Sequence, residues 1–242
     1  GVDIVIPDVS YLEQNQAHLR GMFLTHGHED HIGAIPYLLK QVNVPIYGTK
    51  LTLGLVKNKL QEHGIKAKLN SIKAGDKIKL GAFEIETIRT THSIADSICL
   101  AIDTPAGLVF HSGDFKIDYT PIDGEPIDLS KLAEIGNRGV SLMMADSTNA
   151  LRPGYSDSER VVGQTLESLF RQAKTRIVVA TFSSNVHRVQ KIIDNAVNCG
   201  RKVAVNGRSM ENVIEDVVAD TPIEEAGLNK EIISEYEDVI PE

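Results

Sequence analysis

Apolar and polar residues alternate in two patterns along the first part of the chain. Short β-branched runs predict strands at 2–6, 20–25 and 44–47, and longer amphipathic runs predict helices at 32–40 and 51–63. Strands that alternate with helices are typical of a layered α/β structure.

After residue 76 the pattern changes to short strands separated by tight turns. Strands are predicted at 77–80, 83–90, 98–103 and 108–111. The Gly-Ala and Thr-Pro-Ala-Gly turns between them indicate hairpins, so we expect a mixed sheet here. A polar stretch with one short helix then leads to an apolar strand at 140–145.

From Ser158 onward the order of elements becomes that of a parallel, doubly wound unit. Helices are predicted to 173, over 186–198 and from 209, with strands at 176–182 and 202–206. The irregular segment 151–157 separates the two patterns. We therefore expect one domain over residues 1–154 and a second over residues 155–242.

Composition and charge narrow the class of protein. The chain of 242 residues is 42% hydrophobic and has no apolar run long enough to span a membrane. Its two cysteines, Cys99 and Cys199, lie far apart, which favours a reducing compartment such as the cytoplasm. The first residue is not methionine, so we expect an internal piece of a longer protein.

The net charge of −8 is unevenly distributed. Residues 211–242 hold 11 of the 33 acidic residues and one base, Lys230, so the rest of the chain has 22 acids and 24 bases. A nearly neutral body does not exclude a polyanionic substrate, because a local positive groove can bind one.

The strongest chemical signal is a cluster of ligand-type side chains directly after the strand at 20–25. His26, His28, Asp30 and His31 fall within six residues. Burying three imidazoles and a carboxylate together leaves many polar atoms unpaired, whereas a divalent cation satisfies them at once. In an extended loop His26 and His28 point to one side, which separates them from Asp30 and His31 and predicts two metal ions.

Two further residues gain weight from their positions at strand ends. His92 follows the strand 83–90, and Asp114 follows the strand 108–111. Each alone is an ordinary loop residue, but the ends of neighbouring strands converge in layered α/β folds. His111 precedes Asp114 closely and is a candidate for orienting it by a hydrogen bond.

The order of these residues resembles the motif series of the metallo-β-lactamase superfamily. Within it, the chain is similar to the ribonuclease J group of the beta-CASP family through FLTHGHEDHIGA at 23–34, HSGDFK at 111–116, ADSTN at 145–149 and TFSSNVHR at 181–188. The resemblance implies an αββα sandwich, incomplete in this chain, with part of a Rossmann-like beta-CASP domain. It also implies two divalent metal ions, zinc first and manganese as the alternative.

The resemblance also assigns roles to individual residues. His26, His28 and His92 would hold one metal, Asp30 and His31 the second, and Asp114 would bridge them. Asp30, Asp114 and Asp146 would be catalytic, since Asp146 resembles an acid that supports a catalytic histidine. The alternative is that Asp146 caps a turn with Ser147 and Thr148.

Residues near two strand-to-helix junctions are candidates for substrate binding. Ser184, Asn185 and His187 lie at the start of the helix 186–198, where free backbone N–H groups can receive a phosphate. Arg208 lies at the next junction and can bond a phosphate in a bidentate manner. The alternatives are an ordinary helix N-cap and a solvated arginine.

The predicted function is a two-metal ribonuclease that acts as an endonuclease and a 5′-to-3′ exonuclease in RNA maturation and decay. Its substrate would be single-stranded RNA with a 5′-monophosphate, and its full-length form a homodimer or homotetramer. Rival hypotheses are a beta-CASP DNA nuclease, a small-ester or thioester hydrolase, and a non-catalytic metal-binding scaffold subunit. Family members have two further downstream histidines, and no histidine follows His187 here. We therefore expect weak binding of the second metal by this chain alone.

Overall fold

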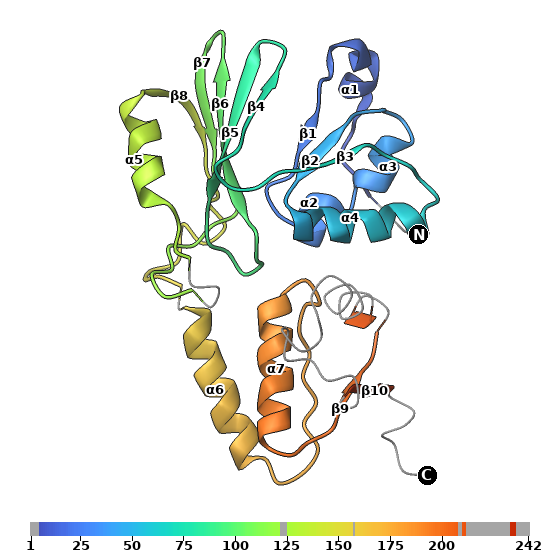
Figure 1. Cartoon of the computed structure of the whole chain (residues 1–242), viewed down its shortest axis with the longest axis vertical. Helices are drawn as coiled ribbons and strands as arrows, with labels where there is room; N and C mark the ends of the chain where they lie inside the picture. The colour runs from blue at the N-terminus through green and yellow to red at the C-terminus, as the bar shows by residue number, and fades with distance from the viewer. Residues whose placement is uncertain (1–4, 122–124, 157, 208–209, 212–232, 236–242) are drawn as a thin grey trace. The chain divides into compact units, whose positions relative to one another are not determined.

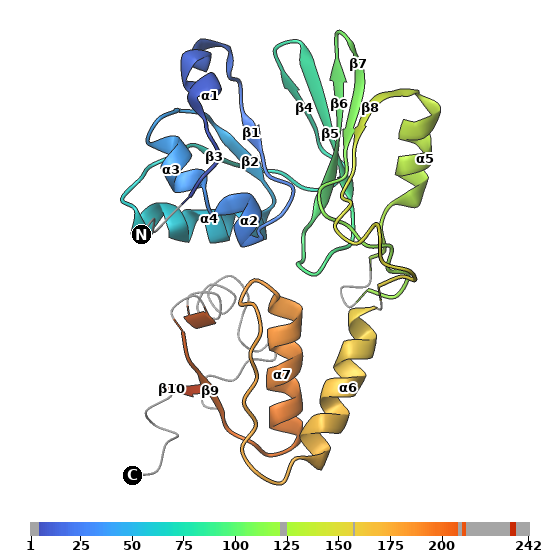
Figure 2. The same cartoon turned by 180° about the vertical axis from the view of Figure 1, so that it is seen from behind.

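A computed structural model describes residues 5–121, 125–156, 158–207, 210–211 and 233–235. The chain divides into two compact units. The first consists of residues 1–117 and 126–155, and the second of residues 118–125 and 156–242. Figures 1 and 2 label the helices and strands of both units.

The first unit begins with a small parallel sheet in the order β1-β2-β3, formed by Met22–Phe23, Ile46–Gly48 and Leu69–Ser71. The segments α1 (Ser10–Gln14) and η1, a 3-10 helix (Gln16–His18), precede β1. Helices connect the strands, as parallel pairing requires. These are α2 (Glu29–Ile32) and α3 (Ile35–Leu39) between β1 and β2, and α4 (Lys50–Glu62) between β2 and β3. A hydrophobic core joins sheet and helices through Leu24, Ile32, Ile35, Ile46, Leu53, Val56 and Leu60.

The second sheet of this unit has five strands in sequential order. They are β4 (Lys77–Leu80), β5 (Phe83–Arg89), β6 (Ile98–Thr104), β7 (Gly107–His111) and β8 (Val140–Met144). The first four pair antiparallel, whereas β7 and β8 pair parallel across α5 (Leu129–Asn137). Ile135 of α5 is buried in a core with residues of β5, β6 and β7.

A third cluster of buried residues lies between the two sheets of the first unit. Ile72, Ile85, Ile98 and Leu100 are buried together, and Phe23 of β1 and Tyr47 of β2 pack against them. The rings of Phe23 and Tyr47 stack with their centroids 4.7 Å apart. The two sheets therefore pack face to face between helical layers, which confirms the predicted αββα sandwich.

In the second unit two amphipathic helices pack against each other. They are α6 (Glu159–Gln172) and α7 (Val186–Asn198), and Phe170, Val189, Ile193 and Ala196 are buried. Ser158 caps α6 by accepting the N–H of Arg160, and Asn185 caps α7 by accepting that of Arg188. The strand β9 (Val203–Val205) pairs in parallel with β10 (Ile233–Glu235), as expected of a Rossmann-like unit.

Most predicted elements of the first unit are present, with two differences. The single helix expected at 32–40 is broken into α2 and α3, because Pro36 starts a new helix and lacks the N–H needed to continue the old one. The strand expected at 2–6 is absent at residues 5 and 6, and residues 2–4 lie outside the described part.

In the second unit the strand predicted at 176–182 is wrong. These residues form no ladder in the described part of the chain, and the side chains of Val178 and Phe182 are exposed. The helix predicted from 209 falls mostly outside the described residues, which show only Met210 and Glu211 as helical. None of the described helices is both long enough and apolar enough to cross a bilayer.

Candidate metal centre

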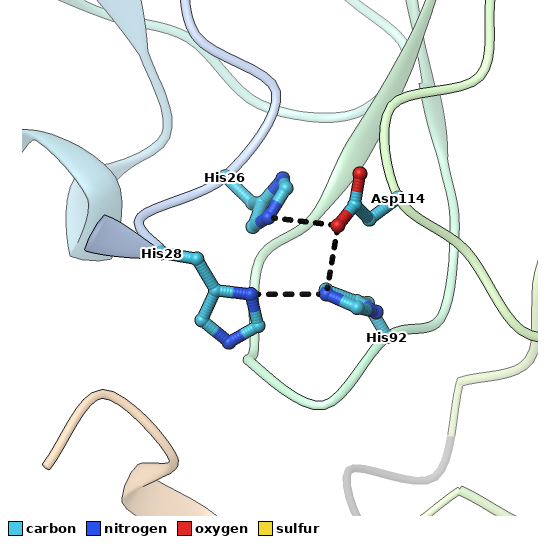
Figure 3. Close-up of side chains that lie close together, drawn as sticks. All are labelled: His26, His28, His92 and Asp114. Carbon is cyan, nitrogen blue, oxygen red and sulfur yellow. Dashed lines mark hydrogen bonds and ion pairs between the residues drawn. The ribbon is translucent and has the colours of Figure 1, made fainter. Parts of the chain in front are cut away.

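Three strand ends of the first unit bring the ligand-type side chains together. His26 and His28 follow β1, His92 follows β5, and Asp114 follows β7. Figure 3 shows His26, His28, His92 and Asp114 pointing toward one another. His28 has an extended backbone at the N-cap of α2, so Asp30 and His31 lie in the first turn of that helix.

The first group consists of His26, His28, His92 and Asp114, whose candidate ligand atoms all lie within 4.8 Å of one another. Oδ2 of Asp114 is 3.9 Å from Nε2 of His26 and 3.7 Å from Nε2 of His92. Nε2 of His92 lies 3.0 Å from Nδ1 of His28. Three imidazoles and one carboxylate form a donor set suited to a divalent cation.

The protonation of these histidines favours metal binding. Burial lowers the pKa of His26 to about 2, and the neighbouring His31, His92 and His28 add to the effect. Burial also lowers the pKa of His92 to about 4, and it lowers the pKa of His28. Neutral imidazole is the form that coordinates a metal.

His26 provides a direct test of whether the site fits a cation. Its side chain is fully buried, and its Nδ1 lies 3.0 Å from Oγ1 of Thr25. Its Nε2 is buried and has no hydrogen-bond partner among the described residues. An orphaned buried nitrogen is costly unless a cation coordinates it, so the residues fit a divalent metal.

The second group consists of Asp30, His31 and Asp114. Nε2 of His31 lies 3.4 Å from Oδ1 of Asp114 and 3.6 Å from Oδ2 of Asp30. Asp114 therefore turns one oxygen toward each group, as a bridging carboxylate does. The side chain of Asp30 is 78% exposed, so this second group is open to solvent.

The backbone of the Asp114 loop is tightly constrained. Gly113 has a φ of +57°, and a Cβ at this position would lie 2.9 Å from Cβ of Thr25. Its N–H donates to Nδ1 of His111 at 3.0 Å. An isolated antiparallel bridge joins Lys116 to Thr91, the residue before His92, so the loops of two candidate ligands are fixed to each other.

Asp146 braces the same loop from the end of β8. Its N–H donates to Oγ of Ser112 at 2.9 Å, and its carboxylate accepts the backbone N–H of Phe115. The carboxylate also accepts the N–H and the hydroxyl of Thr148 at 2.8 and 2.7 Å. These hydrogen bonds lower the pKa of Asp146, and the two from Thr148 have the largest effect. They are the bonds of a turn-capping aspartate, and they hold the residues on both sides of Asp114.

The predicted substrate residues lie in the second unit. Asn185 is buried, and its Oδ1 accepts the N–H of Arg188 at 3.1 Å. Nε2 of His187 is buried without a hydrogen-bond partner in the described part of this unit. Ser184 lies in the turn before α7, and Arg208 lies outside the described residues.

Sequence reasoning missed three hydroxyl residues that support the centre. They are Thr25 beside His26, Ser93, whose Oγ lies 3.4 Å from Nε2 of His28, and Ser112 beside the Asp114 loop. Each is one or two residues from a candidate ligand. That adjacency was the available signal, since histidine ligands commonly bond a second polar group.

Comparisons with known proteins agree with this geometry. A model of the beta-lactamase superfamily domain matches residues 5–181, and a model of the ribonuclease J beta-CASP domain matches residues 174–228. The chain is 53% identical over 218 residues to a ribonuclease J from Synechocystis sp., which covers 88% of this chain and 34% of that protein. A ribonuclease J from Helicobacter pylori is 49% identical, with coverage of 89% and 32%.

A ribonuclease J from Thermus thermophilus is 47% identical and covers 87% of this chain and 38% of its own length. The chain thus spans about a third of these relatives. A crystal structure of a protein of unknown function from Enterococcus faecalis V583 aligns with a TM-score of 0.63 at 20% identity. It covers 89% of this chain and 55% of that one, and its likeness concerns the fold alone.

Proposed function

Because this chain belongs to the beta-lactamase superfamily, we propose that it carries the metal centre of a ribonuclease J-type hydrolase that cleaves RNA phosphodiester bonds. The convergence of three histidines and Asp114 at the ends of three strands is the observation that carries this proposal. The similarity to ribonuclease J proteins over 88% of the chain supports RNA as the substrate.

We propose that His26, His28 and His92 hold one ion and that Asp30 and His31 hold a second. Asp114 would be shared between them, because its Oδ2 lies near His26 and its Oδ1 near His31. When bound, a pair of divalent ions activates water and neutralises charge on the phosphoryl group. Zinc is the first candidate and manganese the alternative, because histidine and carboxylate ligands accommodate both.

Residues of this chain offset the positive charge of the ions and hold the ligands in position. The buried histidines are neutral, so Asp30 and Asp114 supply the negative charge that offsets the ions. Asp30 is the most exposed of the proposed ligands, with a side chain that is 78% exposed. Asp146 acts through the loop that it braces, and keeps Asp114 directed at both groups.

The remaining assignments concern the larger protein. We propose that residues 1–154 belong to the metallo-β-lactamase-like domain and residues 155–242 to part of the beta-CASP domain, which the match at 174–228 supports. Ser184, Asn185, His187 and Arg208 would bind a 5′-monophosphorylated single-stranded RNA. The activity would combine endonucleolytic and 5′-to-3′ exonucleolytic cleavage in cytoplasmic RNA maturation and decay, in a homodimer or homotetramer.

The test compares the product of the complete reading frame with two histidine variants. His28→Ala removes a candidate ligand, and His18→Ala removes an exposed histidine outside the centre as the matched control. Cleavage of 5′-monophosphorylated single-stranded RNA and of DNA with the same sequence is followed with zinc or manganese.

RNA cleavage that His18→Ala retains and His28→Ala loses supports the proposal. Release of mononucleotides from the 5′ end supports exonuclease activity. Cleavage of DNA with RNA left intact would point to a DNA nuclease, and equal activity in all three proteins would rule out the proposed centre.

A further inference from the structure

A lysine-rich surface lies outside the metal centre on the helical layer of the first unit. Residues 34–75 contain seven lysines and one acidic residue, Glu62, in a chain whose net charge is −8. We define the lysine surface by five exposed members of this set: Lys40, Lys50, Lys57, Lys66 and Lys68. In the part of the chain that the structure describes, none of the five forms an ion pair.

The helix α4 carries a continuous stripe of this surface. Lys50 and Lys57 are two turns apart and face the same side of the helix. Gly54 lies between them on this side, and Gln61 follows one turn after Lys57. Leu53, Val56 and Leu60 are buried in the core, so the stripe lies on an exposed flank of the helix. Lys59 differs, since Glu29 binds its Nζ at 2.6 Å. The unpaired lysines are therefore available to an external anion.

The segment that follows α4 carries two further exposed lysines. In the connection to β3, Ile65 and Ala67 pack against the core. Alternation therefore turns Lys66 and Lys68 outward, where both are exposed. Figure 1 shows α3 beside α4.

The end of α3 adds an aromatic ring to the charge. The Nζ of Lys40 lies 5.3 Å from the centroid of the Tyr37 ring, which meets the ring of His63 edge to face at 5.1 Å. Lysines that neutralise phosphates, together with aromatic rings on which unpaired bases stack, are the features that bind single-stranded nucleic acid.

The helix that carries the stripe packs against the metal centre through a different flank, formed by Thr52 and Leu55. A Cβ at Gly27, between His26 and His28, would lie 2.6 Å from Cδ1 of Leu55 and 3.5 Å from Cα of Thr52. The N-terminal half of α4 thus packs against the loop that carries two candidate ligands. From there the helix extends about 20 Å.

We propose that the lysine surface is a docking site for the part of a single-stranded RNA that extends beyond the catalytic centre. This inference rests on the proposed ribonuclease function. The phosphates lie along Lys50 and Lys57, and an unpaired base stacks near Tyr37. The binding is independent of base sequence, because lysines contact phosphates and stacking accepts every base.

The test measures how RNA affinity depends on salt, using full-length protein freed of metal so that the RNA is not cleaved. The double variant Lys50→Gln with Lys57→Gln is compared with Lys73→Gln with Lys79→Gln. The control removes the same charge from two exposed lysines that are not members of the lysine surface. The probe is a labelled RNA of about twenty nucleotides, with one of about four nucleotides for comparison.

Each phosphate contact contributes about 0.7 to the slope of log affinity against log salt for single strands, so the double variant is expected to lower this slope by about 1.4. The control variant and the short RNA are expected to show no such change. A double variant with the slope of the wild type, or a control with the same loss, would overturn the docking site.

Cleavage assays separate this inference from the proposed function. If RNA is cleaved but the double variant retains the slope of the wild type, the docking site is wrong and the ribonuclease proposal stands. If His28→Ala leaves cleavage unchanged while the double variant still lowers the slope, the proposed metal centre is wrong and the RNA-binding surface is supported.

Discussion

At His26, burial and ligand chemistry impose the same protonation state. Its side chain is fully buried, and burial lowers its pKa to about 2 from an ordinary value of 6.5. The unfolded chain takes up a proton near pH 6.5, whereas the folded chain stays neutral there. The imidazole is therefore ready to bind a cation, and the metal-free fold becomes sensitive to acid.

The sign of this dependence follows from the lowered pKa. Below about pH 6.5 the unfolded state binds more protons than the folded state, so the free energy of unfolding decreases as the pH falls. The loss is at most about 1.4 kcal/mol for each pH unit and each excluded proton. For His92 the loss ends near pH 4, and for His26 it continues toward pH 2.

Urea unfolding of the metal-free protein at several pH values measures this linkage. His26→Gln is expected to flatten the dependence by about one proton, and His63→Gln is the matched substitution of an exposed histidine outside the centre. A wild-type protein whose stability is constant between about pH 7 and pH 5 would contradict the buried neutral state.

Gly113 is the second residue whose role is decided by local geometry. Gly113→Ala is expected to destabilise the fold by about 1–3 kcal/mol, because φ is +57° and the new Cβ would lie 2.9 Å from Cβ of Thr25. Metal affinity is expected to fall as well, because Asp114 is the next residue.

Gly136 in α5 provides the matched control for this substitution. A Cβ there meets nothing within 4 Å, so Gly136→Ala is expected to stabilise the helix by about 0.5–1 kcal/mol. Chemical denaturation of the two variants checks the opposite signs. A neutral Gly113→Ala would show that the loop adopts a different backbone.

At the scale of elements, a buried carboxylate ties β5 to its neighbours. The side chain of Glu86 is 3% exposed and lies 2.8 Å from Nζ of Lys131 on α5 and 3.4 Å from Nζ of Lys77 on β4. Burial raises its pKa, but the contacts with Lys131 and Lys77 outweigh burial and hold the pKa below its usual value. The ion pairs therefore fix both the helix and the edge strand to the sheet.

Glu86→Gln is expected to destabilise the first unit by about 1–3 kcal/mol, since Lys77, Lys131 and Arg138 each lose an ion pair and the amide fits the site poorly. Glu84→Gln on the same strand is the control, because Glu84 is exposed and its loss is expected to cost less than about 0.5 kcal/mol. Thermal unfolding of both variants measures the difference. Equal stability would mean that solvent already screens the buried pairs.

Periodicity predicted elements where a strand or helix has one buried face. The strands β4 to β7 and the helices α4 and α7 lie within about two residues of their expected bounds. The strand β3 was missed, because Leu69–Ser71 has no apolar alternation and is held by pairing with β2. The opposite error occurred at 176–182, where β-branched residues have no paired neighbour among the described strands.

The candidate site was predictable to the extent that its ligands cluster in the sequence. His26, His28, Asp30 and His31 are local, and His92 and Asp114 were found because both follow strands. The brace from Asp146 to Ser112 and Phe115 could not be found in this way. It joins loops that are distant in sequence, and it depends on the parallel pairing of β7 with β8.

At the scale of the whole molecule, the net charge is the sum of one basic and one acidic region. Residues 34–75 carry six more bases than acids, whereas residues 211–242 carry ten more acids than bases. An average over the chain predicts repulsion from nucleic acid, but a protein binds RNA through the local field of one surface. The lysine surface on the first unit is such a local field, because none of its five lysines forms an ion pair among the described residues.

Metal binding is expected to couple the candidate centre to the stability of the fold. The ligands come from α2 and the ends of three strands, so an ion that binds only the folded chain stabilises it. At a free metal concentration about 100 times the dissociation constant, the gain is about 2.7 kcal/mol. Removal of metal with a chelator is expected to lower the unfolding temperature, and zinc to restore it.

Two variants separate the contributions of the two groups. His28→Ala is expected to abolish most of this stabilisation, because His28 belongs to the group that contains the fully buried His26. Asp30→Asn is expected to retain most of it, because Asp30 is 78% exposed in the open group. Calorimetric unfolding with and without zinc distinguishes them. If Asp30→Asn lost more stabilisation than His28→Ala, the open group would be the tighter site, and the order of metal binding inferred from burial would be reversed.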